Sequence, residues 1–326
     1  MRRREFIGLL GGAAAAWPLE TRAQQRTQMR HIGFLIGLPA DDPEGYARHA
    51  AFLQGLQELG WTVGRNLRMD YRSAAGVAEN YPKYAAELIA AGSDVLVAGG
   101  TAALAALMQA TRTLPIVFAN AVDPVGSGYV ASLARPGGNA TGFMNTEFGL
   151  AAKWLELLKQ IAPRVTRAIV IRNPGPATSY FAAMQAVAPS LGVELIPVSG
   201  VDAGEMERAI TTFARGPNDG MIVTGQLARI QRDLAIALAA RHRLPAVYPF
   251  RSFVTEGGLA SFGIDQSEPY RLAAGYVDRI FKGERPADLP VQAATKFDTV
   301  INLKTAKALG LDVPPTLLAV ATEVIE

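Results

Sequence analysis

Short runs of apolar residues alternate along the chain with longer segments in which apolar residues recur every three or four positions. The run 31–37 is apolar throughout, as expected of a strand buried on both faces, and the segment 43–59 has helical spacing and ends before a glycine. The same alternation predicts further strands over 66–71, 94–98 and 115–118 and further helices over 81–91 and 102–110. Apolar strands separated by helices indicate a parallel sheet covered on both faces.

The pattern restarts at residue 166. It predicts strands over 166–172, 194–198, 220–223 and 244–248 and helices over 177–189, 205–214 and 227–241. The strand 244–248 (LPAVY) is similar to 114–118 (LPIVF). The chain therefore holds two similar α/β halves in tandem, followed by a helix over 268–281, a strand over 299–303 and a short helix over 304–309.

Two glycine-rich stretches are candidates for passages between the halves. The first, 138–145, leads into a helix over 147–161, and the second, 257–263, follows the second half. This order predicts an α/β fold of two doubly wound, Rossmann-like lobes joined by three crossings. Lobe 1 would comprise 30–144 and 263–288, and lobe 2 would comprise 145–262 and 289–326.

The first 23 residues have the pattern of an export signal. Three arginines precede the apolar run 6–17 (FIGLLGGAAAAW), and Pro18 ends it, so we expect cleavage near Ala23. The run is too short to span a bilayer, which takes about 20 residues. Residues 3–7 (RREFI) are similar to a twin-arginine signal. The alternative is a frayed amphipathic helix at the amino terminus.

Charge and cysteine content narrow the class of protein. The net charge of +3 suggests nucleic acid or an anionic membrane as a partner. However, residues 1–23 carry four arginines and two glutamates, so the remainder has 28 basic against 27 acidic residues and gives no reason to expect nucleic acid. With no cysteine the chain has no disulfide, thiolate metal site, cysteine nucleophile or cysteine-linked lipid anchor, and three histidines disfavour a multi-histidine metal centre.

Candidate binding residues lie in the loops after the predicted strands. Ligands of open parallel sheets bind beyond the carboxyl ends of the strands, and two facing lobes place two such edges across one cleft. Gly100 allows close approach of the backbone, and Thr101 opens a helix whose free amides can face an anion such as a carboxylate. Tyr248 and Phe250 offer rings that can stack on a planar group. The other candidates are Asp123, Asn173 and Gln226.

A structural role is the alternative for each candidate: helix capping for Thr101, turn formation for Asp123, Asn173 and Gln226, and core packing for Tyr248 and Phe250. The run 33–37 lacks the spacing of a dinucleotide-binding loop, and the chain contains neither a P-loop motif nor Gly-x-Ser-x-Gly. None of the three histidines stands in a recognisable catalytic motif. These absences weaken a hydrolase interpretation.

Sequence segments spread over nearly the whole chain match one family pattern. The most specific are 123–126 (DPVG) and 132–142 (SLARPGGNATG). The others are 52–61 (FLQGLQELGW), 64–66 (GRN), 100–104 (GTAAL), 115–118 (PIVF), 154–158 (WLELL), 245–248 (PAVY), 257–259 (GGL) and 300–303 (VINL). Together they resemble the substrate-binding proteins of ABC transporters, of the tryptophan-binding and largely uncharacterised type.

The resemblance implies a type I periplasmic binding fold, in which two lobes close about a hinge on a ligand, without catalysis. It also implies that the closed form docks on an ABC permease of the inner membrane, which works with a cytoplasmic ATPase. The family's binding loops map onto Gly100, Thr101, Asp123, Asn145, Thr146, Asn173 and Gln226.

The chain departs from the family pattern at two positions. Ala102 stands where a proline often follows Thr101, which bears on the rigidity of that loop. Many relatives have an acidic residue near Gln226. Its neutral amide leaves recognition of a ligand ammonium group open, so an organic acid or an amide-bearing ligand fits as well as an amino acid.

The sequence therefore predicts a periplasmic solute-binding protein that captures a small, carboxylate-bearing ligand and delivers it to an ABC importer. Two alternatives remain: a secreted or periplasmic α/β enzyme of hydrolase type, and a ligand sensor that acts through a membrane receptor. A regulator of the same fold would need a helix-turn-helix, for which the segment before residue 31 offers no pattern. We expect no metal, no cofactor and no nucleic acid, and a monomer that diffuses freely in the periplasm.

Overall fold

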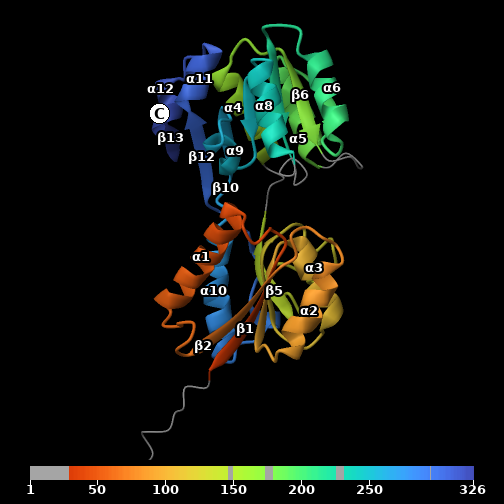
Figure 1. Cartoon of the computed structure of the whole chain (residues 1–326), viewed down its shortest axis with the longest axis vertical. Helices are drawn as coiled ribbons and strands as arrows, with labels where there is room; N and C mark the ends of the chain where they lie inside the picture. Colours follow the sequence, from red (N-terminus) through yellow and green to blue (C-terminus); the bar gives the residue numbers. More distant parts are fainter. Residues whose placement is uncertain (1–28, 146–149, 173–178, 225–230, 294) are drawn as a thin grey trace, which may run out of the picture.

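The computed structural model describes residues 29–145, 150–172, 179–224, 231–293 and 295–326. These residues form two lobes, one above the other in Figure 1, and each lobe is built on a single sheet with helices on both faces. The predicted α/β fold with two doubly wound lobes is confirmed.

Lobe 1 contains a six-stranded parallel sheet with the strand order β11-β5-β4-β3-β1-β2. Its strands are β1 (Arg30–Ile36), β2 (Leu67–Ser73), β3 (Val95–Gly99), β4 (Ile116–Ala121), β5 (Ala140–Met144) and β11 (Gln292–Ala293). Its helices are α1 (Pro43–Glu58), α2 (Asn80–Ala90), α3 (Thr101–Ala110), α10 (Glu268–Phe281) and the 3₁₀ turn η3 (Pro286–Asp288). Helices α1 and α10 cover one face of the sheet, and α2 and α3 cover the other.

Strand β1 shows why this sheet needs helices on both sides. Ile32, Phe34 and Ile36 belong to the cluster under α1 and α10, whereas Leu35 belongs to the cluster under α2 and α3. Side chains alternate between the two faces of a strand, and all four are fully buried. A strand with apolar residues at every position is stable only when both faces are covered.

Lobe 2 contains a seven-stranded sheet with the order β13-β12-β10-β9-β8-β6-β7, in which only the β10–β12 pair is antiparallel. Its strands are β6 (Arg167–Arg172), β7 (Glu194–Ser199), β8 (Asp219–Val223), β9 (Ala246–Tyr248), β10 (Ala260–Ile264), β12 (Phe297–Asn302) and β13 (Glu323–Ile325). Its helices are α4 (Ala151–Ile161), α5 (Ser179–Leu191), α6 (Ala203–Phe213), α8 (Arg232–Arg241), α9 (Arg251–Thr255), α11 (Leu303–Leu309) and α12 (Pro315–Val320).

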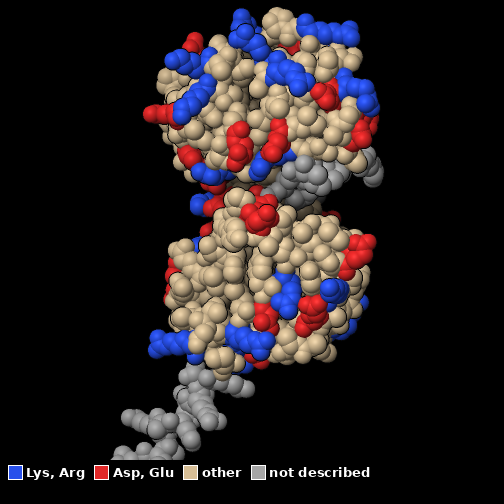
Figure 2. Space-filling view, viewed as in Figure 1, with Lys and Arg blue, Asp and Glu red and all other residues tan. Residues whose placement is uncertain are grey.

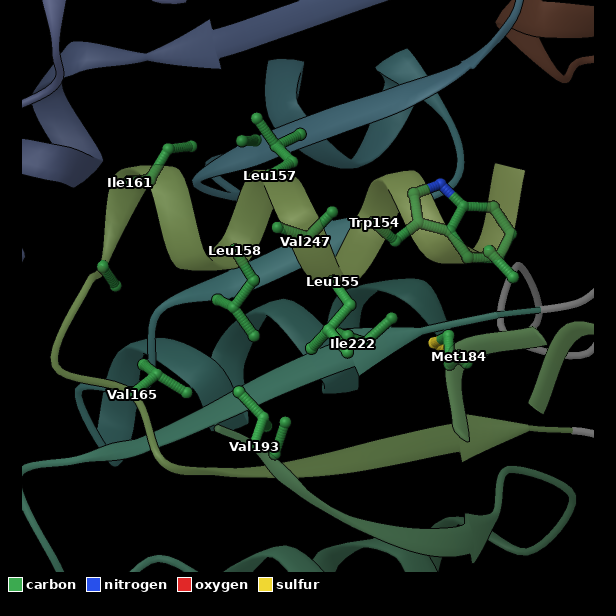
Figure 3. Packing of buried hydrophobic residues seen from close by; sticks show 14 of the residues in the cluster. Trp154, Leu155, Leu157, Leu158, Ile161, Val165, Met184, Val193, Ile222 and Val247 are labelled. Atoms are coloured by element: carbon green, nitrogen blue, oxygen red, sulfur yellow. The ribbon is translucent and has the colours of Figure 1, made fainter. Parts of the chain in front are cut away.

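Helix α4 forms the centre of one of the two cores of lobe 2. Figure 3 shows Leu155 and Leu158 pointing from α4 toward Ile222 of β8, with Trp154 on the same helix. These positions recur every three or four residues, which places them on one face of the helix. The indole Nε1 of Trp154 donates to the carbonyl oxygen of Phe262 at 2.6 Å, so the ring is buried without an unpaired polar group. This bond ties α4 to β10.

The chain crosses between the lobes three times, as predicted: after β5, between β10 and α10, and between β11 and β12. The lobe boundary expected at residue 289 is wrong, because the following residues still belong to lobe 1. Gln292 pairs with Phe143 at the edge of the first sheet, Leu289 and Val291 lie in the lobe 1 cores, and Thr141 donates to the Leu289 carbonyl. The third crossing therefore follows Ala293.

Strands β5 and β10 lie in the two stretches that the sequence pattern presented only as passages. Both stretches are rich in glycine, which is typical of loops, so the sequence pattern did not indicate strands there. In β5, Gly142 has φ 150°, and a Cβ at this position would clash with the backbone of Phe118 on the neighbouring strand. The glycine is thus required by close approach of two strands and does not mark a loop.

None of the helices in the described part of the chain combines the length and the apolar character needed to cross a membrane.

Candidate functional site

A cavity of about 220 Å³ lies between the two lobes and is lined by both of them. Lobe 1 contributes the start of α1, and lobe 2 contributes the start of α8 and the segment around α9. The second crossing and the start of β12 form the rest of the wall. The lining residues are Asp42, Pro43, Glu44, Ala47, Arg232, Pro249, Phe250, Arg251, Ser252, Thr255, Glu256, Gly263, Ile264, Asp265, Gln266, Ser267 and Asp298.

A wider groove, more open to solvent, lies on lobe 2 alone, between β7 and α6. Ile196 and Arg208 are among its lining residues. Because only one lobe lines it, relative movement of the lobes cannot close it. The interlobe cavity is therefore the better candidate for a ligand site.

The charges around the interlobe cavity are mostly negative. Five carboxyl side chains line it, from Asp42, Glu44, Glu256, Asp265 and Asp298, and two arginines, Arg232 and Arg251. Figure 2 shows acidic residues in red on both lobes next to their common border. Such a wall suits a ligand with a cationic group.

Two of these carboxyl groups differ in their electrostatic environment. Burial raises the pKa of Asp298 above its usual range, and the nearby Asp265 adds to this effect. Burial also opposes ionisation of Asp265, but hydrogen bonds from Lys296 at 2.7 Å and from the Ser267 amide at 2.9 Å outweigh it and lower the pKa of Asp265. Asp265 is therefore the more firmly ionised of the two, and its bond to Lys296 joins the second crossing to the third.

The lobe 1 side of the cavity is set by the start of α1. Asp42 Oδ1 accepts from the backbone amide of Glu44 at 2.8 Å, and Pro43 occupies the first helical position, where its missing N–H is not needed. Glu44 in turn accepts a hydrogen bond from Arg48, one turn further along. The helix cap and Arg48 thus hold the carboxyl groups of Asp42 and Glu44 at the end of α1 that faces lobe 2 (Figure 1).

Four of the predicted site residues come together at the edge of lobe 1 formed by the ends of β3, β4 and β5. Gly100, with φ 96°, precedes α3, and its amide donates to the Ala119 carbonyl at 2.9 Å. Thr101 Oγ1 accepts from the Val122 amide at 3.0 Å, which ties α3 to the segment leading to Asp123. The Asn145 amide donates to the Ala121 carbonyl at 2.8 Å.

Asp123 also has the turn role that its sequence context suggests. Its φ is 41°, and its Oδ1 accepts from the Gly126 amide at 2.9 Å. The four residues of this edge do not line the interlobe cavity described above. The structure therefore brings them together without showing that they contact a ligand.

The two aromatic candidates have different positions. Tyr248 is fully buried and stacks on Phe253 in the core of lobe 2, with ring centroids 4.9 Å apart, so the predicted stacking of Tyr248 on a ligand is not available. Phe250 also packs in this core, but it lines the interlobe cavity as well. The remaining candidates, Thr146, Asn173 and Gln226, lie outside the described residues.

Sequence reasoning missed most of the cavity wall. The Asp-Asp-Pro-Glu start of α1 follows β1 closely, so the rule that ligands bind after strands could have included Asp42 and Glu44. Gln266 at the second crossing and Asp298 at the start of β12 come together only in the folded chain. No local pattern marks them.

A two-lobed α/β structure with a cavity between the lobes at the crossings is the architecture of a hinge-bending ligand-binding protein. Comparison with known families agrees with this. The chain belongs to the family "ABC transporter substrate binding protein", whose family model matches residues 37–325. The predicted resemblance is confirmed, and the fold is that of the type I periplasmic binding proteins.

Individual relatives cover nearly all of the chain. A tyrosine-binding protein from Clostridioides difficile (strain R20291) is 25% identical over 294 residues, which are 90% of this chain and 84% of that protein. A conserved domain protein from Vibrio cholerae has a TM-score of 0.80 and 29% identity, covering 91% of this chain and all of that one. An ABC domain from Streptococcus pneumoniae in complex with L-Trp has a TM-score of 0.78 and 25% identity, covering 91% and 99%.

Proposed function

We propose that this protein binds a free amino acid, or a closely related small carboxylate, between its two lobes and delivers it to an ABC importer. The observation that carries the proposal is the cavity of about 220 Å³ to which both lobes and the crossings contribute. This volume is below the roughly 300–1,000 Å³ of pockets for drug-sized ligands, so it suits a small metabolite. Relatives that bind tyrosine and tryptophan support an amino acid.

The lining chemistry matches the two ends of an amino acid. Arg251 pairs with Glu323 through Nε and Nη2, and Arg232 pairs with Asp233 through Nε. Their remaining N–H groups are the donors for a ligand carboxylate, and the acidic side chains of the wall are acceptors for an ammonium group. A neutral residue at position 226 therefore does not exclude an amino acid, because the carboxylates that line the cavity can bind the ammonium group. Phe250 adds an apolar surface.

Transport requires that the ligand favours one arrangement of the lobes. Residues of α1 on lobe 1 and of α9 on lobe 2 line opposite sides of the cavity. A ligand that touches both gains more contacts when the lobes approach, and this difference shifts the equilibrium toward the closed form. The closed form is the one we expect to dock on the permease. We expect binding without turnover, and a detected product would instead favour the hydrolase-type alternative.

Export is part of the proposal. Residues 1–23 carry the predicted twin-arginine signal and lie outside the described residues. Changing the arginines at positions 3 and 4 to lysine should keep a fused reporter in the cytoplasm of a bacterial host, while the unchanged signal directs it to the periplasm. Export of the lysine variant at the normal level would contradict a twin-arginine route.

Thermal melting of the chain from residue 24 onward tests the binding proposal. The protein is melted alone and with each of the twenty L-amino acids, with small mono- and dicarboxylates, and with sugars as controls. A ligand at a hundredfold excess over its Kd stabilises the folded state by about 2.7 kcal/mol, which raises the Tm by several degrees. A shift with an amino acid and none with sugars supports the proposal, and no shift with any amino acid or carboxylate refutes it.

A further inference from the structure

Gln266 lies at the second crossing, in the wall of the interlobe cavity, with 9% of its surface exposed. Its side chain carries one acceptor oxygen and two N–H donors, and a buried amide of this kind needs partners for them. The partners also decide which way the amide faces, since its oxygen and nitrogen have nearly the same shape.

The partner of the amide oxygen is Arg48 of α1. Arg48 Nη2 lies 3.2 Å from Gln266 Oε1 and also donates to Glu44. The guanidinium is buried, and its carbon lies 5.7 Å from the centre of the Tyr270 ring. Burial alone would lower the pKa of Arg48, but Glu44 and Tyr270 outweigh it and raise the pKa. A charged guanidinium can only donate, so the amide oxygen of Gln266 has to face Arg48.

The backbone of Gln266 is also fastened to lobe 1. Asn120, at the end of β4, donates from Nδ2 to the carbonyl oxygen of Gln266 at 2.9 Å. Asn120 is itself buried and has a φ of 59°. With its oxygen held by Arg48 and its backbone held by Asn120, the Gln266 side chain has a fixed orientation relative to lobe 1.

The nitrogen of the amide is left with spare donor capacity. Nε2 donates one N–H to the Ile264 carbonyl over a long 3.4 Å. No second acceptor for Nε2 lies within bonding distance in the described part of the chain. The second N–H of Nε2 is therefore available to an oxygen of a ligand that enters the cavity. The neighbouring carboxyl of Asp265 is already engaged by Lys296.

We propose that Gln266 is a specificity-determining residue of the interlobe cavity and that its amide N–H donates to an oxygen of the ligand, best a carboxylate oxygen. Arg48 is the positioning residue that keeps the donor side of the amide toward the cavity. The proposal rests on the proposed function for the place of the ligand, and it adds which chemical group of the ligand lies at the second crossing.

The substitution Gln266→Glu tests this directly. Glutamate keeps the size of the side chain and can pair with Arg48, but it presents a charged acceptor where glutamine presents a donor. Calorimetric titration uses the amino acid that binds the wild type most tightly and the amine that results from its decarboxylation. We expect Gln266→Glu to weaken binding of the amino acid by about tenfold or more, while binding of the amine changes by less than about threefold.

A matched control separates this effect from added charge or lost stability. Gln57→Glu makes the same chemical change on the exposed face of α1 and should leave both affinities unchanged. Gln266→Met removes the donor without adding charge, so it should weaken the amino acid less than Gln266→Glu does. If Gln266→Glu weakens the amino acid and the amine equally, or neither of them, the inference is overturned while the proposed function stands.

A second measurement does not depend on amino-acid binding. Acetate is titrated into ¹⁵N-labelled protein as the smallest carboxylate probe, and the Gln266 side-chain amide signal is assigned by its loss in Gln266→Met. We expect acetate to shift this signal in the wild type and in Gln57→Glu. If no amino acid or related carboxylate shifts the Tm, the proposed function fails. The acetate titration, read at the Gln266 signal, still decides the inference in that case, because an unmoved signal overturns it.

Discussion

Replacing Trp154 should destabilise lobe 2 strongly, because this one side chain both fills the core and donates to a partly buried carbonyl. The ring is 1% exposed and lies beside Tyr180, with ring centroids 5.7 Å apart. Its Nε1 bond to Phe262 holds β10, the strand that leads into the second crossing and Gln266. Loss of the ring should therefore affect the cavity wall as well as the core.

The magnitude follows from the two contributions. Trp154→Phe removes the indole donor from the partly buried Phe262 carbonyl and shrinks a fully buried ring, which together cost about 1–3 kcal/mol. Trp154→Ala adds a cavity in the core, and substitutions of this kind cost about 3–5 kcal/mol. For a lobe of this size the second figure corresponds to a fall in Tm of about 10 °C.

Trp61 provides the control in lobe 1. Its Nε1 donates to Asp278 Oδ1 at 3.0 Å, but the ring is partly exposed, and Lys282 also binds Asp278, at 2.7 Å. Trp61→Phe should therefore cost only about 1 kcal/mol. After removal of residues 1–23 the chain has just these two tryptophans, so each single variant leaves one fluorescent reporter in one lobe.

Urea unfolding followed by circular dichroism and by tryptophan fluorescence measures the difference. We expect Trp154→Phe to lower the free energy of unfolding clearly more than Trp61→Phe does. Equal losses for the two variants would contradict the prediction, because Trp154 is the more deeply buried of the two rings and also donates to the Phe262 carbonyl.

Two further predictions concern the lobe 1 sheet and the acidic cavity wall. Gly142→Ala places a Cβ against the backbone of Phe118, whereas Gly128 also has a positive φ but has open space around it. Gly128→Ala should therefore cost only about 1–2 kcal/mol, from the positive φ, and Gly142→Ala should lower the Tm far more. Equal falls in Tm for the two variants would contradict this prediction, because they would show that β4 and β5 can move apart to admit the methyl group. The raised pKa of Asp298, caused by burial and then by Asp265, means that its contribution to stability is complete below the unfolded pKa and is lost as the pH rises through the folded pKa. Asp298→Asn should therefore increase the free energy of unfolding at pH 7 relative to the wild type. The gain should vanish near pH 3.5, roughly the ordinary pKa range of an aspartate, where the wild-type carboxyl is protonated. Urea unfolding measured across this pH range tests the prediction, and a variant less stable than the wild type at pH 7 would contradict it.

Elements with a strong local pattern were predictable. The helix predicted over 268–281 is α10, with the same bounds, because its polar and apolar positions follow the helical period and Glu268 and Pro269 mark its start. The strand predicted over 166–172 is β6, which is one residue shorter. Each of these segments carries enough local information for one type of structure.

Short strands at sheet edges were not predictable. Strand β11 has two residues, both exposed, and exists because the free edge of β5 offers hydrogen-bonding groups to the returning chain. This pairing decides that residues 289–293 belong to lobe 1. A two-residue segment has no periodicity that could predict it. The lobe to which β11 belongs is decided by its pairing with β5, about 150 residues earlier in the chain.

The candidate site residues likewise divide into those whose positions a local pattern predicted and those whose positions depend on tertiary packing. The gathering of Gly100, Thr101, Asp123 and Asn145 at one edge of lobe 1 was predictable, because each lies after a strand or in a segment that matches the family pattern; that they contact a ligand stays a prediction. Tyr248 follows the same rule but lies in the core, since a side chain near the end of a strand can point to either face. The direction of a single side chain is decided by the packing around it.

The sequence by itself determined the α/β class, the tandem lobes, the family and the chemical types available for binding, because these depend on local periodicity and on motifs. The tertiary structure alone decided that α1, α9, the second crossing and Asp298 meet in one cavity. It also decided that Gln266 faces Arg48, which lies 218 residues away in the chain. Contacts at such separations arise from how the sheets pack and how the crossings run, and no local pattern of residues encodes them.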